Sequence, residues 1–91
     1  MLNLTEGAAE AIRGLVGDRP DAGLRIFSRK DDGNQIELGL SISDRPETGD
    51  EVVDHSGTHV FVDAQIAPIL DGRTLDANVG DGQRVQFGFV S

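Results

Sequence analysis

The stretch GLRIFSRKDDGNQIELGLSIS, residues 23–43, decides the fold, because it contains two strand-like runs joined by a short acidic turn. In the second run, apolar residues alternate with polar or small residues, which is the period of a strand that buries one face. In the first run, Leu24 and Ile26 share a face. We therefore predict a central antiparallel hairpin whose apolar face consists of Leu24, Ile26, Ile36, Leu38, Leu40 and Ile42.

The same period predicts the register of this hairpin. Leu24 and Ile26 reach the apolar face of the second run only if paired residue numbers sum to an even number, since a one-residue slip inverts every side chain. That parity requires a loop with an odd number of residues. The loop Asp31-Asp32-Gly33 satisfies it, with Gly33 in the left-handed conformation. The expected pairs are Ile26 with Leu38, Leu24 with Leu40, and Phe27 with Glu37.

Two elements are predicted before the hairpin. Leu2 and Leu4 indicate a short leading strand or an extended entry. Thr5 is a favourable N-cap residue for a helix over residues 6–16, and Gly17 suits the position just after that helix. The side chains expected on the buried face of the helix are Ala8, Ile12, Leu15 and Val16.

A second hairpin is predicted after the central one. Strands over residues 51–54 and 58–63 flank the loop His55-Ser56-Gly57. If Gly57 repeats the role of Gly33, Val52 lies opposite Val60 and His59 lies opposite Val53.

The last third of the chain is predicted to contain a helix and two strands. Asp63 would cap a helix over residues 64–70, which Pro68 shortens or distorts because its ring removes an amide donor. Strands over residues 74–77 and 84–90 follow, and the final strand presents one apolar face, made by Val85, Phe87 and Phe89.

These elements define one small domain over residues 1–91. The strands are too many and too short for a parallel α/β sheet. We predict a β-rich α+β domain, a β-sandwich of about six to seven short, mostly antiparallel strands with two short helices.

Composition excludes several classes of function. The sequence contains no cysteine, so neither disulfides nor thiolate-bound metals or clusters are available to its 91 residues. Sixteen acidic against eight basic residues, a formal charge of −8, argue against nucleic acid or anionic lipid as a partner. The first residues lack a basic region followed by an apolar run, and no stretch approaches membrane-spanning length. A cytoplasmic location is the expectation.

Five short segments of the sequence resemble, in the same order along the chain, segments of the HesB/IscA family of A-type iron–sulfur carrier proteins. The most specific of them is the segment Leu70 to Asp76, because the family similarly has a Gly, a Thr or Ser, an apolar residue and an Asp after its second helix. The other four matching segments, which precede it in the chain, are Leu4–Ile12, Gly23–Ile26, Asp50–Val53 and Val60–Asp63. The resemblance covers nearly the whole chain and implies a HesB-like fold that is often dimeric or tetrameric.

The family's chemistry is not implied for this chain. In the family, one cysteine lies at the turn of the central hairpin and a Cys-Gly-Cys lies near the C-terminus, and thiolates are the soft ligands that hold iron–sulfur clusters. Here the first position falls within residues 30–34, which contain Asp31-Asp32-Gly33, and the second would lie beyond Ser91. We therefore expect no thiolate-based cluster binding.

Two groups of residues are candidate metal ligands. Asp31 and Asp32 supply hard oxygen donors on one turn, although Asp, Gly and Asn are also the ordinary residues of tight turns. Asp54, His55 and His59 combine carboxylate and imidazole, the remaining transition-metal ligands, although exposed histidines in a hairpin are the simpler interpretation.

The sequence thus predicts a non-catalytic HesB-like domain without a bound cofactor. It would be a protein-interaction or accessory module linked to iron–sulfur or iron metabolism, acting as a homodimer or with a protein partner. The alternative is a small-ligand or metal-binding protein that uses Asp and His ligands.

Overall fold

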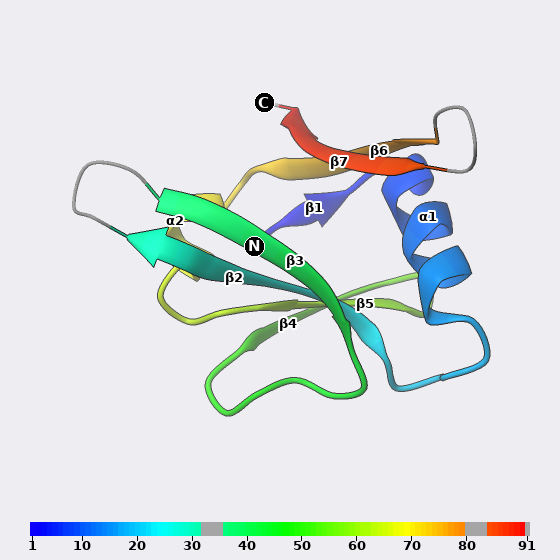
Figure 1. The fold of residues 1–91 in the computed structure, drawn as a ribbon, viewed down its shortest axis with the longest axis horizontal. Coiled ribbons are helices and arrows are strands. Elements are labelled where there is room, and N and C mark those ends of the chain that lie inside the picture. Colours follow the sequence, from blue (N-terminus) through cyan, green and yellow to red (C-terminus); the bar gives the residue numbers. More distant parts are fainter. Residues whose placement is uncertain (32–35, 80–83, 91) are drawn as a thin grey trace.

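The part of the chain that the structure describes contains two β-sheets and two short helices (Figure 1). The computed structural model describes residues 1–31, 36–79 and 84–90. The elements in chain order are β1 (Asn3–Leu4), α1 (Glu6–Val16), β2 (Gly23–Asp31), β3 (Ile36–Ser43), β4 (Glu51–His55), β5 (Thr58–Val62), α2 (Ala67–Leu70), β6 (Thr74–Val79) and β7 (Val85–Val90).

The larger sheet has the strand order β3-β2-β5-β4, and the smaller sheet has the order β1-β6-β7. The pairs β2–β5 and β1–β6 are parallel, and the other three pairs are antiparallel. This arrangement confirms the predicted β-rich α+β class with mostly antiparallel strands.

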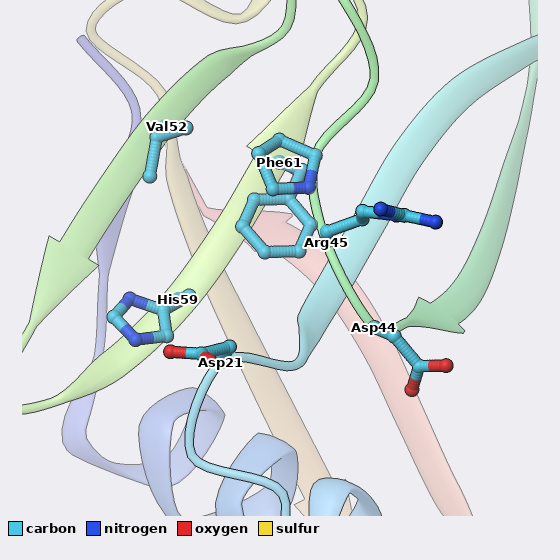
Figure 2. A pocket seen from close by; sticks show the side chains of 7 residues that line it. Asp21, Asp44, Arg45, Val52, His59 and Phe61 are labelled. Atoms are coloured by element: carbon cyan, nitrogen blue, oxygen red, sulfur yellow. The ribbon is translucent and has the colours of Figure 1, made fainter.

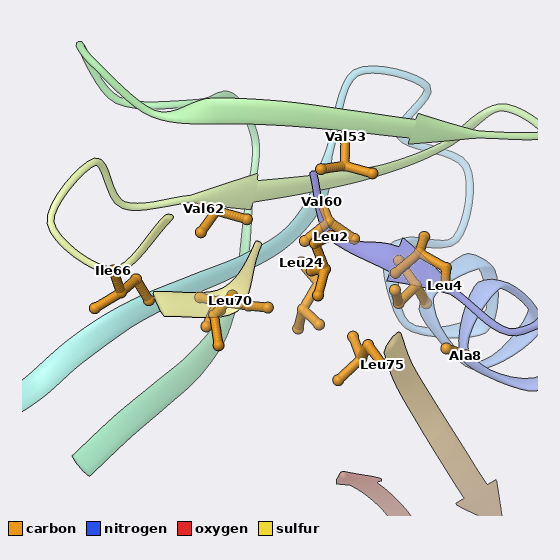
Figure 3. Close-up of a cluster of buried hydrophobic side chains, with 12 residues drawn as sticks. Leu2, Leu4, Ala8, Leu24, Val53, Val60, Val62, Ile66, Leu70 and Leu75 are labelled. Carbon is orange, nitrogen blue, oxygen red and sulfur yellow. The ribbon is translucent and has the colours of Figure 1, made fainter. Parts of the chain in front are cut away.

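The core lies between the two sheets and α1, and it is apolar (Figure 3). Each sheet contributes residues of one face, and α1 and α2 add theirs from the sides. The buried members are Leu2, Leu4, Ala8, Ile12, Leu24, Ile26, Val53, Val60, Val62, Ile66, Leu70 and Leu75. None of the helices in the described ranges is long and apolar enough to cross a membrane.

Helix α1 begins and ends where the sequence predicts. Thr5 is its N-cap, and the Thr5 hydroxyl accepts a hydrogen bond from the Ala8 amide at 3.1 Å. Gly17 ends the helix at φ +62°, a conformation that favours glycine. The expected burial of Leu15 is wrong: the buried residues are Ala8, Ala9, Ala11 and Ile12, and Leu15 lies at the exposed margin of this stripe.

From Gly23 to Ser28 the central hairpin has the predicted parity but not the predicted register. Ile26 pairs with Leu40 and Phe27 pairs with Gly39, so each partner lies two residues further along β3 than expected. In the observed register the Phe27 ring and the Arg29 side chain pack over Gly39, where a Cβ atom would lie 2.5 Å from each of them. Any other residue at this position would displace these two side chains.

The turn of this hairpin also differs from the prediction. Asp31 is the last residue of β2 and pairs with Ile36, so it does not belong to the loop. The register shifts by one residue between Ser28 and Lys30, which is a β-bulge. Asp32 and Gly33, the other two residues of the predicted loop, lie outside the described residues.

The predicted register of the second hairpin is wrong by one residue. A two-residue turn, Ser56-Gly57, joins β4 to β5, and both residues have positive φ angles of 52° and 80°. His55 therefore ends β4 and pairs with Thr58, instead of lying in a loop. Because the parity changes, Val53 pairs with Val60 and is 5% exposed, whereas Val52 is 45% exposed on the other face.

The second helix, α2, is shorter than predicted: it begins at Ala67 instead of Ala64 and ends at Leu70. Pro68 lies in its first turn, where a missing amide donor is tolerated. The Asp63 carboxylate accepts a hydrogen bond from the Gln65 amide at 2.9 Å and forms a turn before the helix. Strand β6 extends to Val79, two residues beyond the prediction, and β7 presents the expected half-buried face, which consists of Val85, Phe87 and Phe89.

Candidate functional site

The histidines of the second hairpin do not form one site. Asp54 pairs with His59 across β4 and β5, so these two side chains share a face, while His55 points to the opposite face. His59 Nδ1 lies 3.7 Å from Asp54 Oδ2. His55 Nε2 instead lies 3.0 Å from Oε1 of Glu6 at the start of α1.

Each histidine therefore has its own carboxylate. The hydrogen bond from His55 lowers the pKa of Glu6. Within residues 1–31, 36–79 and 84–90, no three His, Asp or Glu side chains are grouped so that they could hold a metal ion. Of the other two metal candidates, Asp31 ends β2 and Asp32 lies outside the described residues.

The face of the larger sheet that points away from the core is called here the outer face, and it is partly covered. It carries Arg25 and Phe27 of β2, His59 and Phe61 of β5, and Val52 and Asp54 of β4. Phe61 is buried although it points away from the core. The segment of residues 44–50, between β3 and β4, lies against this face: Arg45 and Pro46 line the same groove as Phe61. Glu47 and Asp50 of the segment contact Arg25.

A groove of about 610 Å³ opens beside this segment (Figure 2). Phe61 and Val52 form its apolar floor, and Asp21 and His59 point toward one another at one end. Asp44, Arg45 and Pro46 form its wall. The groove therefore combines an apolar floor with one arginine, one histidine and two acidic side chains on its rim.

An ion pair under this segment holds it in place, and sequence reasoning did not find it. Arg25 Nε and Nη2 donate hydrogen bonds of 3.0 and 3.1 Å to the two carboxylate oxygens of Asp50. The Asp50 side chain is 2% exposed and that of Arg25 is 14% exposed. Glu47 and Asp63 lie at 3.3 and 3.6 Å from the same guanidinium.

Burial and hydrogen bonding act in opposite directions on Asp50. Burial raises the pKa of the Asp50 carboxyl, but the Arg25 guanidinium and the Glu47 amide, which donates at 2.9 Å, outweigh it and lower the pKa. The hydrogen bond to Asp50 raises the pKa of Arg25 in turn. The sequence contains one signal for this ion pair: a charged residue, Arg25, lies between two apolar residues of β2, Leu24 and Ile26.

Asp76, in the segment that carries the most specific part of the family resemblance, has a structural role. Its Oδ1 accepts a hydrogen bond of 2.6 Å from the Thr5 hydroxyl and one of 2.9 Å from the Ala77 amide. These two hydrogen bonds, the one from Thr5 first, lower the pKa of Asp76. The carboxylate thus links β6 to the start of α1.

Comparison with known proteins places these features in a family. No family model matches the chain. An uncharacterised protein of Bradyrhizobium diazoefficiens, blr1755, is 35% identical over 78 residues, which span 84% of this chain and 74% of that protein. The iron–sulfur cluster insertion protein ErpA of Erwinia tasmaniensis is 28% identical over 86 residues, which span 91% of this chain and 75% of ErpA.

A solved structure shows the same fold. The crystal structure of Escherichia coli SufA, a protein involved in the biosynthesis of iron–sulfur clusters, superimposes with a TM-score of 0.77 at 31% sequence identity. The superposition covers 98% of this chain and 83% of SufA. By fold and by sequence, the chain belongs to the HesB/IscA family.

Proposed function

We propose that this protein is a non-catalytic HesB-like domain that acts as an interaction or accessory module in iron–sulfur metabolism, and that it does not carry a cluster on thiolates of its own. The observation that carries the proposal is a SufA-like fold, at 31% identity, built from 91 residues that contain no cysteine.

The remaining ligand types do not replace the thiolates in the part of the chain that the structure describes. His55 and His59 point to opposite faces of their hairpin, and each contacts a different carboxylate. Asp76, in the segment with the most specific part of the resemblance, accepts a hydrogen bond from Thr5 and so links β6 to the start of α1. These observations support a domain that keeps the fold for contacts with other proteins.

The first experiment is anaerobic reconstitution with ferrous iron and sulfide, followed by visible absorption and analysis of protein-bound iron. We expect both signals at the level of a protein-free blank, because soft sulfur ligands hold such clusters. IscA, for which a crystal structure with a [2Fe-2S] cluster is known, is the positive control. Stoichiometric iron and sulfide on this chain would contradict the proposal.

The second experiment identifies the partner. The purified chain, immobilised through an added terminal tag, is used to capture proteins from a lysate of its native host, and mass spectrometry identifies them. The control bait is Ile26→Asp, which places a charge in the core and should not fold. We expect the folded bait to enrich iron–sulfur assembly proteins or iron–sulfur enzymes.

Two results would count against parts of the proposal. Specific partners from an unrelated process would remove the iron–sulfur link, and no difference between the two baits would remove the interaction role.

A cytoplasmic location belongs to the same proposal, and fractionation of the native host tests it.

A second candidate function rests on the groove of the outer face. Its apolar floor and its rim of His59, Asp21 and Arg45 have the composition of a small-ligand site. A screen of metabolites by thermal shift tests this alternative, with His59→Ala as the variant that should abolish any shift. If no compound raises the melting temperature of the wild-type chain, this alternative has no support.

A further inference from the structure

A second pocket, of about 190 Å³, lies at the C-terminal end of α1. Three elements form it, namely the last turn of α1, the connector of residues 17–22 and the start of β5 with the turn before it. Its volume is roughly six times the ~30 Å³ that a water molecule occupies in the liquid. The pocket can therefore hold a small ion or one end of a small molecule.

The ionisable side chains that line this pocket are all basic. Arg13 comes from α1, Arg19 from the connector and His59 from β5, and no acidic residue occurs among the described residues that line it. The whole chain has sixteen acidic against eight basic residues. The pocket thus reverses the overall charge locally, and such a reversal favours a negatively charged ligand.

Arg13 has the largest capacity to bind such a ligand. Its Nη1 donates a hydrogen bond of 3.1 Å to the hydroxyl of Thr58, which is 2% exposed. This contact orients the guanidinium without neutralising its charge, and none of the ion pairs between described residues includes Arg13. A guanidinium has five N–H donors, so most of them remain for an oxyanion.

Arg19 and His59 are held by carboxylates that do not line the pocket. Arg19 Nη1 lies 2.8 Å from Asp44 Oδ1, and His59 Nδ1 lies 3.7 Å from Asp54 Oδ2. The hydrogen bonds of the described residues do not use Nη2 of Arg19 or Nε2 of His59. Both side chains therefore keep a nitrogen for a ligand while their carboxylate partners hold them in place.

The carbonyl groups at the end of α1 would repel an anion if they were unpaired. Arg13 O accepts a hydrogen bond from the Gly17 amide at 3.1 Å, and Val16 O accepts one from Arg19 Nε at 3.2 Å. Arg19 thus places a positive charge at the negative end of the helix dipole. A residue of the pocket itself compensates the helix end that the pocket adjoins.

The remaining wall of the pocket is largely apolar, and it consists of Ile12, Val16, Pro20 and Ala22. An inorganic ion would leave this wall uncovered, whereas the carbon part of an ester would cover it. The basic side chains come from three different elements, so they suit the oxygens of a phosphate group, which point in several directions, better than the two coplanar oxygens of a carboxylate.

We propose that this pocket binds a small phosphate monoester. The phosphate group lies at Arg13, with Arg19 and His59 beside it, and a short aliphatic group lies against the apolar wall. The inference does not depend on the proposed function, because it uses neither iron–sulfur chemistry nor a protein partner.

The test is a titration of the wild-type chain with propyl phosphate at constant ionic strength, followed by the NMR chemical shifts of the backbone amides. We expect saturable changes that are largest at the pocket, at Arg13, Gly57 and Thr58. This measurement needs no variant, so it locates the site even if a substitution disturbs folding.

A matched pair of variants tests the role of Arg13. We expect Arg13→Gln to raise the dissociation constant at least about tenfold, since a hydrogen bond to a charged group contributes enough for that factor. Arg73→Gln is the control, because it makes the same change of charge at an exposed arginine that does not line the pocket. His59 lines both the groove of the outer face and this pocket, whereas Arg13 lines only the pocket, so Arg13 distinguishes the two sites.

Two further compounds test the two parts of the ligand. Inorganic phosphate should bind more weakly than propyl phosphate, because it does not cover the apolar wall, and 1-propanol should not bind. Four results would overturn the proposal. They are no saturable change with propyl phosphate in the millimolar range, changes confined to amides away from the pocket, equal dissociation constants for Arg13→Gln and Arg73→Gln, and binding of inorganic phosphate as tight as that of the ester.

Discussion

The Thr5 hydroxyl donates a hydrogen bond of 2.6 Å to Oδ1 of Asp76, across 71 residues of sequence. The same hydroxyl oxygen accepts from the Ala8 amide at 3.1 Å and so caps α1. One hydroxyl thus satisfies a free amide of the helix and attaches that helix to β6 of the smaller sheet. Segments far apart in the chain meet here through groups that carry no cluster chemistry.

Replacing Thr5 with Ala removes both hydrogen bonds. We expect Thr5→Ala to lower the free energy of unfolding by about 1 kcal/mol, which is typical for loss of an N-cap side chain. Urea denaturation followed by circular dichroism measures it. Thr5→Ser is the control, because it keeps the hydroxyl and should remain close to the wild type. Equal stability of Thr5→Ala and Thr5→Ser would show that the hydroxyl contributes nothing.

Removing Arg25 leaves the buried Asp50 carboxylate without its main partner. We expect Arg25→Ala to lower the free energy of unfolding by about 3 kcal/mol, because an uncompensated buried charge is strongly destabilising. The double variant Arg25→Met with Asp50→Asn should recover a large part of the loss, since both charges are then gone. If the double variant is as unstable as the sum of the two single variants, the two side chains do not act as a pair.

The same carboxylate makes stability depend on pH. The pKa of Asp50 is lowered in the folded protein, so its stabilising effect is fully present above its unfolded pKa of about 3.9 and is lost as the pH falls through the folded pKa. We expect thermal melting between neutral pH and strongly acidic pH to show a smaller acid loss in Asp50→Asn than in the wild type. Parallel pH curves for the two proteins would contradict this assignment.

Two neighbouring valines test the register of the second hairpin. Val53 is buried in the core and Val52 is exposed. We expect Val53→Ala to destabilise by about 2 kcal/mol through lost burial and a residual cavity, and Val52→Ala to stay within about 0.5 kcal/mol of the wild type. Chemical denaturation measures both. A larger effect at Val52 would support the register that pairs Val52 with Val60.

The separation of His55 and His59 leads to a prediction about metals. Since the two rings lie on opposite faces of their hairpin, we expect zinc and nickel to leave the melting temperature of the wild type unchanged. The melting temperature is measured by differential scanning fluorimetry with and without each metal. A rise in the wild type that is absent in His55→Ala would establish a site that includes His55.

Local rules in the sequence were sufficient for several elements. The N-cap at Thr5, the apolar period and Gly17 predict α1 with correct ends. The alternation over residues 23–43 predicts the central hairpin, the burial of Leu24 and Ile26, and the parity of the pairs from Gly23 to Ser28, but not the exposure of Leu40. These predictions succeed because period, cap and turn chemistry act over a few residues.

Register and turn length needed more than local rules. In the observed β2–β3 register the Phe27 ring packs over Gly39, and the observed β4–β5 register contains a two-residue turn in which Ser56 has a positive φ. In each hairpin, both the predicted and the observed register are compatible with the alternation of apolar residues. Burial of the competing side chains in the assembled core decides between them.

The sequence by itself determined that this chain has a HesB-like fold without a thiolate in its 91 residues, because residue types and their order are sufficient for both conclusions. Only the tertiary structure decided that His55 and His59 diverge, that Arg25 holds Asp50 under the segment of residues 44–50, and that Leu40 remains exposed on an open edge. These properties depend on contacts between residues far apart in the chain, which form only when the sheets and α1 pack together.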